Sequence, residues 1–207
     1  MSDYLVLDAV SKALRRILWD AFSADPVIQP IVGSESAIVF SNPTETARDS
    51  SNRLSLWLYQ ITENEYVKNQ PMLRARTQPP PADGRVAAQF PPMALNLFFL
   101  VTPFGQTGEA DHLLLGKTVQ VLYDHATVFL QDAPNKVFEE LRVIFCRVSL
   151  EELTRIWESL REPYRLSVCY LVRVTRVDSQ RTPENALVLE RSAGFGGGDD
   201  SQTLAAV

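Results

Sequence analysis

VIFCRV at residues 143–148, SLEELTRIWESL at 149–160 and RLSVCYLVRVT at 165–175 decide the fold of this 207-residue chain. The first segment is a short run of β-branched and aromatic residues with apolar side chains on both faces, which is typical of a covered strand. In the last segment the apolar residues recur with a period of two, which predicts a long strand with one apolar and one mixed face. The predicted apolar face consists of Leu166, Val168, Tyr170, Val172 and Val174. The stretch therefore predicts a strand–helix–strand packing unit.

The middle segment predicts a helix with a defined beginning and end. Ser149 and Glu152 are spaced as a capping box, in which each side chain accepts a hydrogen bond from the backbone N–H of the other residue. Pro163 predicts the end, because proline cannot continue the helical hydrogen bonds and disfavours helical angles in the preceding residue. The apolar residues between them are three and four apart and form one stripe: Leu150, Leu153, Ile156, Trp157 and Leu160.

Composition limits the classes of function. The length is typical of one domain, and 45% hydrophobic residues are enough for a core. The net charge of −5 gives no electrostatic reason to expect nucleic acid or an anionic membrane as partner. The chain begins without the pattern of a secretory signal, and no apolar run approaches the roughly 18–20 residues of a membrane span, so synthesis is predicted to be cytoplasmic. Cys146 and Cys169 are interpreted as small core residues rather than a disulfide or a metal pair.

The N-terminal third predicts one helix and two strands. Residues 3–23 have the spacing of an amphipathic helix, residues 37–40 of a short strand, and residues 41–52 of a polar connection. Residues 54–61 carry bulky side chains on both faces, which predicts a strand in the centre of its sheet. The predicted buried stripe of the helix consists of Val6, Val10, Ala13, Leu14, Ile17, Leu18 and Ala21.

The middle of the chain predicts a strand, a helix and a loop. Residues 93–102 are the strand, residues 103–105 turn the chain, and acidic residues at 109 and 111 mark the first turn of the helix, where the helix dipole favours them. The predicted buried stripe of this helix consists of Leu115, Val119, Leu122 and Ala126. A loop is expected to run through Pro134. Beyond Asp178, residues 187–189 are compatible with a short edge strand.

These elements predict an α+β fold, with a mixed, mainly antiparallel sheet packed by helices. Residues 1–180 are expected to form one domain that includes a long arm at 63–92. Residues 181–207 are expected to be a C-terminal extension, largely flexible, because glycine is concentrated at 194–198.

The arm at 63–92 allows two interpretations. It is either a hairpin connection or an arm that becomes ordered against a neighbouring subunit, since irregular segments of this length are uncommon in compact domains and usually serve a function or are disordered. Aromatic residues, methionine and arginine are enriched at protein interfaces, which favours the second interpretation. The candidate subunit-interface residues are Tyr66, Met72, Leu73, Arg74 and Arg76.

The sequence predicts no catalytic residue, no cofactor and no metal site. His112 and His125 are thirteen residues apart on one predicted helix and therefore lie on different faces, and no third ligand has a recognisable spacing. The glycines at 194–198 are not a phosphate-binding loop, because no lysine and no strand-to-helix switch accompany them. The pattern indicates a structural subunit rather than an enzyme.

Three segments together resemble the tail-terminator (cap) proteins of contractile injection systems, which are phage-tail-like particles that drive a tube out of a contracting sheath. The first is LSLWLYQITEN (54–64) with KNQ (68–70). The second is PPMALNLFFLVTPFG (91–105) with HLLLG (112–116) and VLYDH (121–125). The third is LEELTRIW (150–157) with PYRLSV (163–168), Tyr170 and Val172. The resemblance covers about residues 4–180 in matching order.

The resemblance implies a phage tail-terminator-like fold and a structural role without a cofactor. The family's members form a hexameric ring on the last layer of inner tube and sheath proteins, end polymerisation and fix the particle's length. The resemblance therefore implies that this chain is part of an assembled particle, which can be released from the cell. Some relatives carry an additional C-terminal domain, for which the residues after 178 leave no room.

Two alternatives remain open at this point. A baseplate or adaptor component of the same kind of particle would be present in few copies, so a mass measurement separates it from a ring subunit. A small enzyme would need titratable groups clustered in a pocket. The sequence does not distinguish contact with the tube from contact with the sheath, nor whether the ring forms before it docks.

Overall fold

The computed structural model describes residues 4–48, 52–67, 73–74, 88–133 and 136–179. The chain divides into two compact units, one of residues 1–71 and 91–180 and one of residues 72–90 and 181–207. In the second unit the described elements are the short strands β3 (Leu73–Arg74) and β4 (Ala88–Gln89), which pair antiparallel. The predicted edge strand at 187–189 and glycine-rich tail at 194–207 lie outside the described residues.

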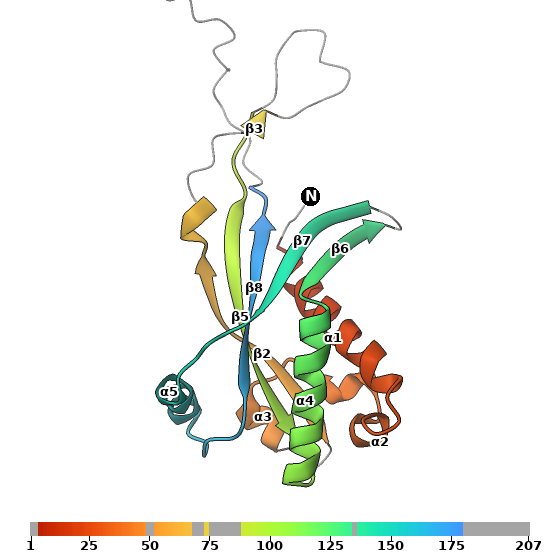
Figure 1. Ribbon diagram of the computed structural model, residues 1–207. Helices are drawn as coiled ribbons and strands as arrows, with labels where there is room; N and C mark the ends of the chain where they lie inside the picture. Colours follow the sequence, from red (N-terminus) through yellow and green to blue (C-terminus); the bar gives the residue numbers. More distant parts are fainter. Residues whose placement is uncertain (1–3, 49–51, 68–72, 75–87, 134–135, 180–207) are drawn as a thin grey trace, which may run out of the picture. The chain divides into compact units, whose positions relative to one another are not determined.

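The first unit is built on a six-stranded sheet with the order β1-β2-β5-β8-β7-β6 (Figure 1). Only the pairing of β1 with β2 is parallel, and the other four pairings are antiparallel. The strands are β1 (Ile38–Val39), β2 (Arg53–Glu63), β5 (Met93–Phe104), β6 (Thr127–Ala133), β7 (Lys136–Phe145) and β8 (Val168–Val177). The predicted α+β class, with a mixed and mainly antiparallel sheet, is therefore confirmed.

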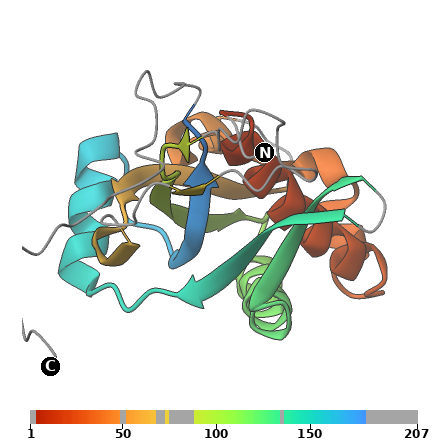
Figure 2. The same cartoon turned by 90° about the horizontal axis from the view of Figure 1, so that it is seen from above.

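Helices cover the two faces of this sheet. The helices are α1 (Val6–Ser23), α2 (Gln29–Val32), α3 (Pro43–Ala47), α4 (Gly108–Asp124) and α5 (Leu150–Leu160), with 3₁₀ turns at Glu35–Ala37 and Glu65–Val67. Helices α1 and α4 pack with alternate sheet residues such as Phe99 and Val101 into the main core. Their neighbour Leu100 points to the other face, where it packs with Leu153 of α5 and Cys169 of β8. Figure 2 shows the sheet between α5 and the α1–α4 pair. None of the described helices is long and apolar enough to span a membrane.

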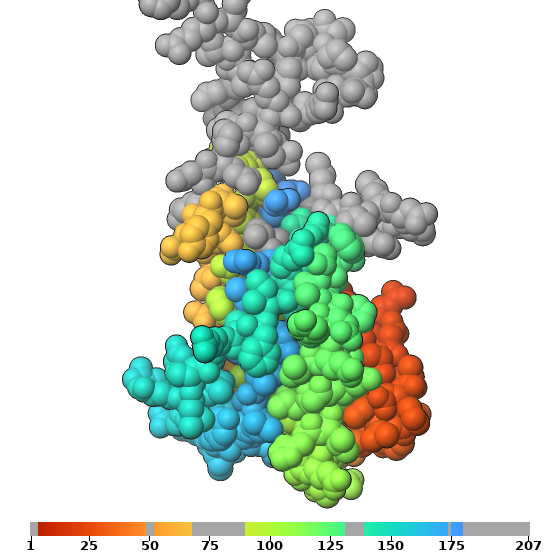
Figure 3. All heavy atoms as spheres, in the orientation of Figure 1, coloured from red at the N-terminus to blue at the C-terminus, as the bar shows by residue number. Residues whose placement is uncertain are grey.

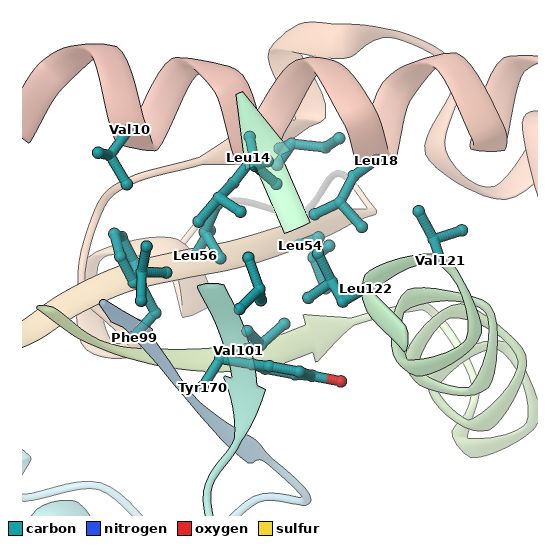
Figure 4. Packing of buried hydrophobic residues seen from close by; sticks show 14 of the residues in the cluster. Val10, Leu14, Leu18, Leu54, Leu56, Phe99, Val101, Val121, Leu122 and Tyr170 are labelled. Carbon is teal, nitrogen blue, oxygen red and sulfur yellow. The ribbon is translucent and has the colours of Figure 1, made fainter. Parts of the chain in front are cut away.

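The main core is formed by α1 lying across β2 and α4. Every fourth residue of α1 is buried, namely Val6, Val10, Leu14, Leu18 and Phe22. Figure 4 shows the α1 side chains close to Leu54 and Leu56 of β2, with Val121 and Leu122 of α4 beside them. Full burial of one such side chain contributes roughly 1.5–3 kcal/mol, so the stripe is a main source of stability. The helix predicted at 3–23 is present but begins at Val6. Phe22 is an additional buried residue, and Ala13, Ile17 and Ala21 of the predicted stripe are only half-buried.

The buried face of α4 overlaps the predicted one only at Leu115 and Leu122. Its buried residues are Leu114, Leu115, Thr118, Val121 and Leu122. The predicted Ala126 is exposed and lies beyond the end of the helix, and Val119 is only half-buried. Thr118 is tolerated in the core because its hydroxyl donates a hydrogen bond to the Leu114 carbonyl oxygen at 2.7 Å.

The turn into α4 is tight and requires glycine. Strand β5 continues through Pro103 to Phe104, two residues beyond the predicted end. The Gly105 N–H donates to the Asp111 carboxylate at 2.6 Å, and a Cβ at Gly105 would lie 2.9 Å from the Ala110 Cβ. The second Asp111 oxygen accepts from Arg165 at 3.4 Å, and this ties the segment before β8 to the turn.

The opening stretch of the sequence forms the predicted strand–helix–strand unit with different boundaries. The first strand, β7, spans 136–145 instead of 143–148, and its end is not covered on both faces, because Phe145 is 55% exposed. The last strand, β8, starts at Val168, so Leu166 precedes it and is exposed. Leu150 is also exposed, because it lies at the N-terminal end of α5, beyond the part that contacts the sheet.

The predicted capping box of α5 is confirmed at both of its hydrogen bonds. The Glu152 N–H donates to Ser149 Oγ at 3.2 Å, and the Ser149 N–H donates to Glu152 Oε2 at 2.8 Å. The helix ends at Leu160, earlier than the proline requires, because Arg161 adopts the left-handed conformation (φ 57°). Its N–H bonds back to the carbonyl oxygens of Glu158 and Trp157.

Two further predictions on the elements are wrong, and a third is confirmed only in part. The connection at 41–52 contains α3, capped by the Asn42 side chain, and the predicted loop after α4 contains β6. Strand β2 is central only at its beginning: on its β1 side the described residues pair with Leu54 and Ser55 alone.

Cys146 and Cys169 are both free thiols, Cys169 buried and Cys146 half-buried.

Candidate interaction surfaces

Tyr66 is the most exposed large hydrophobic residue among those described, with 93% of its surface accessible. It lies in the 3₁₀ turn that follows β2. The turn is held by the buried Asn64, whose Oδ1 accepts from the Tyr66 N–H at 3.0 Å and whose Nδ2 donates to Asn96 Oδ1 at 3.0 Å. The Asn64 N–H donates to the Ala94 carbonyl oxygen at 2.8 Å. Tyr66 is therefore presented to solvent from a backbone that is fixed to β5.

Two more apolar side chains lie at the same end of the sheet as Tyr66. Ile61, near the end of β2, and Met93, at the start of β5, are both exposed, Met93 to 54%. Ile61 pairs with Leu97 across the β2–β5 ladder, and Met93 pairs with Val177 at the end of β8. We refer to Ile61, Tyr66 and Met93 as the open end of the sheet. The sequence analysis did not identify Ile61 and Met93 as interface candidates. They continue the alternating pattern of their strands, which does not distinguish an exposed apolar residue from a buried one.

The other predicted interface residues belong to the second unit. Leu73 and Arg74 form β3, opposite Gln89 and Ala88 of β4. The segment 63–92 is thus not irregular throughout, since β2, a 3₁₀ turn, β3 and β4 all include part of it. Met72 and Arg76 lie outside the described residues. The structure therefore places Tyr66 in one unit and Leu73 and Arg74 in the other.

A second candidate surface is the face formed by α4 and the β6–β7 hairpin, which Figure 3 shows toward the viewer. Large hydrophobic side chains on these elements are exposed, with Tyr123 the most accessible at 82%. The others on these elements are Leu113, Phe129 and Phe145, of which Phe129 and Phe145 point to opposite faces of the sheet, because Phe145 is on the same face as Val128 and Leu141. Phe145 stacks edge-on against Tyr170 with ring centroids 5.4 Å apart, and this contact fixes its orientation.

A groove of about 600 Å³ lies between α5 and the sheet. Its lining includes Tyr59, Phe98 and Ile156, with the charged Glu152 and Arg155 from α5. We refer to it as the α5 groove. Tyr59 Oη lies 3.0 Å from Cys169 Sγ, and burial followed by this hydrogen bond raises the pKa of the Tyr59 hydroxyl. No local sequence pattern indicates a groove here, because its lining residues are distant in the chain.

The two histidines do not approach each other. His112 is exposed in the second turn of α4, and His125 caps its other end, with Nδ1 2.9 Å from the Val121 carbonyl oxygen. Within the described ranges, no three His, Cys, Asp or Glu side chains are grouped so that they could hold a metal ion. The two histidines therefore lie near opposite ends of α4, too far apart to bind one metal ion together.

Comparison with known proteins assigns the fold. Residues 9–191 match the Pvc16 N-terminal domain family. The chain belongs to this family. The match extends to residue 191, beyond the range of about 4–180 over which the sequence resembles tail terminators, so the segment after β8 includes part of the Pvc16 N-terminal domain. No curated protein is significantly similar to the chain in sequence.

Two solved structures share the fold of this Pvc16 N-terminal domain. The sheath/tube terminator of an extracellular contractile injection system, PVC, in the extended state aligns with a TM-score of 0.61 and 19% identity. The tube-terminating cap of the anti-feeding prophage aligns with a TM-score of 0.57 and 16% identity. The alignments cover 98% and 89% of this chain but only 66% and 60% of those proteins. The resemblance to tail-terminator proteins is therefore confirmed, and at these identities the two structures show a shared fold.

Proposed function

We propose that the chain is a structural terminator subunit of a contractile injection system. It caps the distal end of the inner tube and sheath, ends their polymerisation and so fixes the particle's length. The observation that carries the proposal is the family match over residues 9–191. The roles of the two solved relatives, a sheath/tube terminator and a tube-terminating cap, support the same function.

The proposed working form is a hexameric ring. Ring closure needs a heterologous contact, in which one surface of each subunit binds a different surface of the next. The structure offers two separate exposed apolar regions in the first unit, the open end of the sheet and the α4–β6–β7 face. Contiguous exposed apolar patches mark protein–protein interaction sites, so these regions are the candidates for subunit contacts. A non-enzymatic ring subunit needs no other site.

The proposed location follows from this role. The chain is made in the cytoplasm, joins the particle there and leaves the cell with it when the particle is released. One relative, the PVC terminator, belongs to an extracellular contractile injection system, which supports this location. The partners of the chain are then further copies of itself and the tube and sheath proteins.

The proposal is tested by mass measurement and microscopy of the purified full chain. Light scattering should report a hexamer, alone or after addition of the tube protein from the same particle, and negative-stain images should show rings. Tube polymerisation in the presence of the chain should give shorter tubes with one end capped. A persistent monomer that neither binds tubes nor changes their length would contradict the terminator role. A stable complex with few copies per particle would instead identify an adaptor or baseplate component.

A further inference from the structure

The two cysteines of the chain lie opposite each other on neighbouring strands. The last pair of the β7–β8 ladder is Phe145 with Tyr170, so the next residues along it are Cys146 and Cys169. The Cys146 N–H donates to the Cys169 carbonyl oxygen at 2.8 Å, which continues the ladder by one pair. Residues directly opposite in antiparallel strands have Cα atoms about 4.5–5.5 Å apart and side chains on the same face. Disulfides span Cα distances of about 4.4–6.8 Å, so this pair meets their requirement.

The side chains confirm what the backbone register indicates. Cys169 belongs to the smaller core and Cys146 packs against the same core, so both side chains lie on one face of the sheet, and the Tyr59 hydroxyl lies 3.0 Å from Cys169 Sγ. The Tyr59 hydroxyl is protonated at neutral pH and can therefore donate to the Cys169 sulfur. Hydrogen bonds from Cys146 and then from Tyr59 lower the pKa of the Cys169 thiol. The bond with Cys169, together with burial, raises the pKa of Cys146.

The two thiols differ in their access to solvent. Cys169 is 2% exposed, beneath α5 in the smaller core. Cys146 is half-buried and lines the α5 groove, whose volume of about 600 Å³ admits a small molecule. An oxidant therefore reaches Cys146 first, and Cys169 is positioned only to complete the reaction. Because the pKa of Cys146 is raised, little of its thiolate is present at neutral pH, so this first step should be faster at alkaline pH.

We propose that Cys146 and Cys169 form a reversible cross-strand disulfide when the protein meets a low-molecular-weight disulfide, such as oxidised glutathione. The Cys146 sulfur loses its proton and attacks one sulfur of the oxidant, whose S–S bond breaks and releases one thiolate. The Cys169 sulfur then loses its proton and attacks Cys146 Sγ, which releases the second thiolate. The two released thiolates take up the two protons. The protein is oxidised by two electrons and the oxidant is reduced by two.

The new bond would connect the two ends of the segment that carries α5. Residues 147–168 include α5 and both of its connections, and α5 contacts the sheet through Leu153 and Ile156 beside the two thiols. A disulfide across this segment restricts its freedom in the unfolded chain and holds α5 on its sheet face. This disulfide is independent of the proposed terminator role.

The test is to incubate the full chain with oxidised glutathione, block remaining thiols and digest with trypsin without reduction. Cleavage after Arg142, Arg147, Arg165 and Arg173 isolates the cysteines in the peptides VIFCR (143–147) and LSVCYLVR (166–173). The expected result is a linked pair of these peptides, an intact mass lower by two hydrogens, and full reversal by dithiothreitol. The melting temperature should rise by roughly 5–10 °C.

Single-cysteine variants separate the two steps. Cys169→Ser should stop at one glutathione on Cys146, and Cys146→Ser should take up none, because the remaining thiol is buried. Tyr59→Phe should accumulate more of the glutathione adduct in the wild-type cysteine background, since it removes the hydrogen bond that favours the Cys169 thiolate. Two unchanged thiols in the native wild-type chain would overturn the proposal. A disulfide found only between two chains on a non-reducing gel would overturn it too.

Discussion

Glu152 illustrates how one residue of the capping box depends on pH. Hydrogen bonds from the Ser149 backbone N–H and hydroxyl, with Arg155 nearby, lower the pKa of the Glu152 carboxyl. A carboxyl whose pKa is lower in the folded chain stabilises the fold above its unfolded pKa of about 4.3. That contribution is lost as the pH falls through the lower folded value, because both states then bind the proton.

Replacement of Glu152 by Gln isolates the charge, since glutamine still accepts the Ser149 N–H bond. We expect the urea midpoint of Glu152→Gln to be lower than that of the wild type at pH 7. The two midpoints should converge near pH 3 and below. Asn42→Ala is the matched control, because the Asn42 side chain caps α3 through the Glu45 N–H and does not titrate: its loss should cost about 1 kcal/mol at both pH values. A wild-type advantage that persists unchanged at pH 3 would show that the charge of Glu152 is not its source.

At the residue scale, local chemistry was predictable, and burial was predictable within long regular helices but not at the ends of elements. The Ser149–Glu152 box depends on residues three apart, so the sequence contains all of its information. The exposure of Phe145 and Leu150 depends on where α5 ends over the sheet, which no local pattern encodes. The candidate Tyr66 is exposed as an interface residue must be, and its function as one stays a prediction.

At the element scale, the length and regularity of a pattern decided what could be predicted. Helices α1 and α5 repeat their apolar residues without interruption, and both were predicted. Helix α4 was located, but its buried face includes the polar Thr118, which a purely apolar pattern excludes. Strand β6 was missed because it follows α4 directly and because Gln131 and Asp132 interrupt its apolar run.

The segment 63–92 gives a prediction at this scale. If it orders against a neighbouring subunit, the isolated monomer should be cut by protease between Glu63 and Pro92, and the assembled ring should be protected there. Ordering costs roughly 1–2 kcal/mol per residue, so only a large contact compensates for it. Deletion of residues 72–84 should leave the first unit folded, because its sheet and helices lie outside them. The deleted chain should form no rings. Normal rings and normal particle length after the deletion would show that the segment is only a connection.

At the scale of the whole molecule, the order of the segments identified the family while no single segment did. Apart from the β6–β7 hairpin, the strands that pair in the sheet are separated in sequence by helices or by the segment 63–92. Pairings such as β2 with β5 therefore cannot be predicted from any local stretch of sequence. The contacts between six copies of this chain in a ring likewise cannot be predicted from the sequence of one copy. The exposed apolar regions of the structure allow the proposed contacts between subunits to be tested.

Tyr66 and Tyr123 form a matched pair for this test, since both are tyrosines with more than four-fifths of their surface exposed. Neither contributes to the cores of the first unit, so Tyr66→Ser and Tyr123→Ser should each leave the monomer's melting temperature unchanged. A large side chain fully buried at a subunit contact contributes roughly 1.5–3 kcal/mol, which corresponds to about a 10- to 100-fold weaker contact when it is lost.

We expect Tyr66→Ser to move the concentration at which rings assemble upward by about that factor, because Asn64 fixes its backbone and no rearrangement can replace the contact. Mass photometry over a concentration series measures the shift. If only Tyr123→Ser weakens the ring, the α4–β6–β7 face carries the contact and the open end of the sheet does not. If both variants weaken it, the two regions are the complementary surfaces of one heterologous contact, which is the arrangement that a closed ring requires.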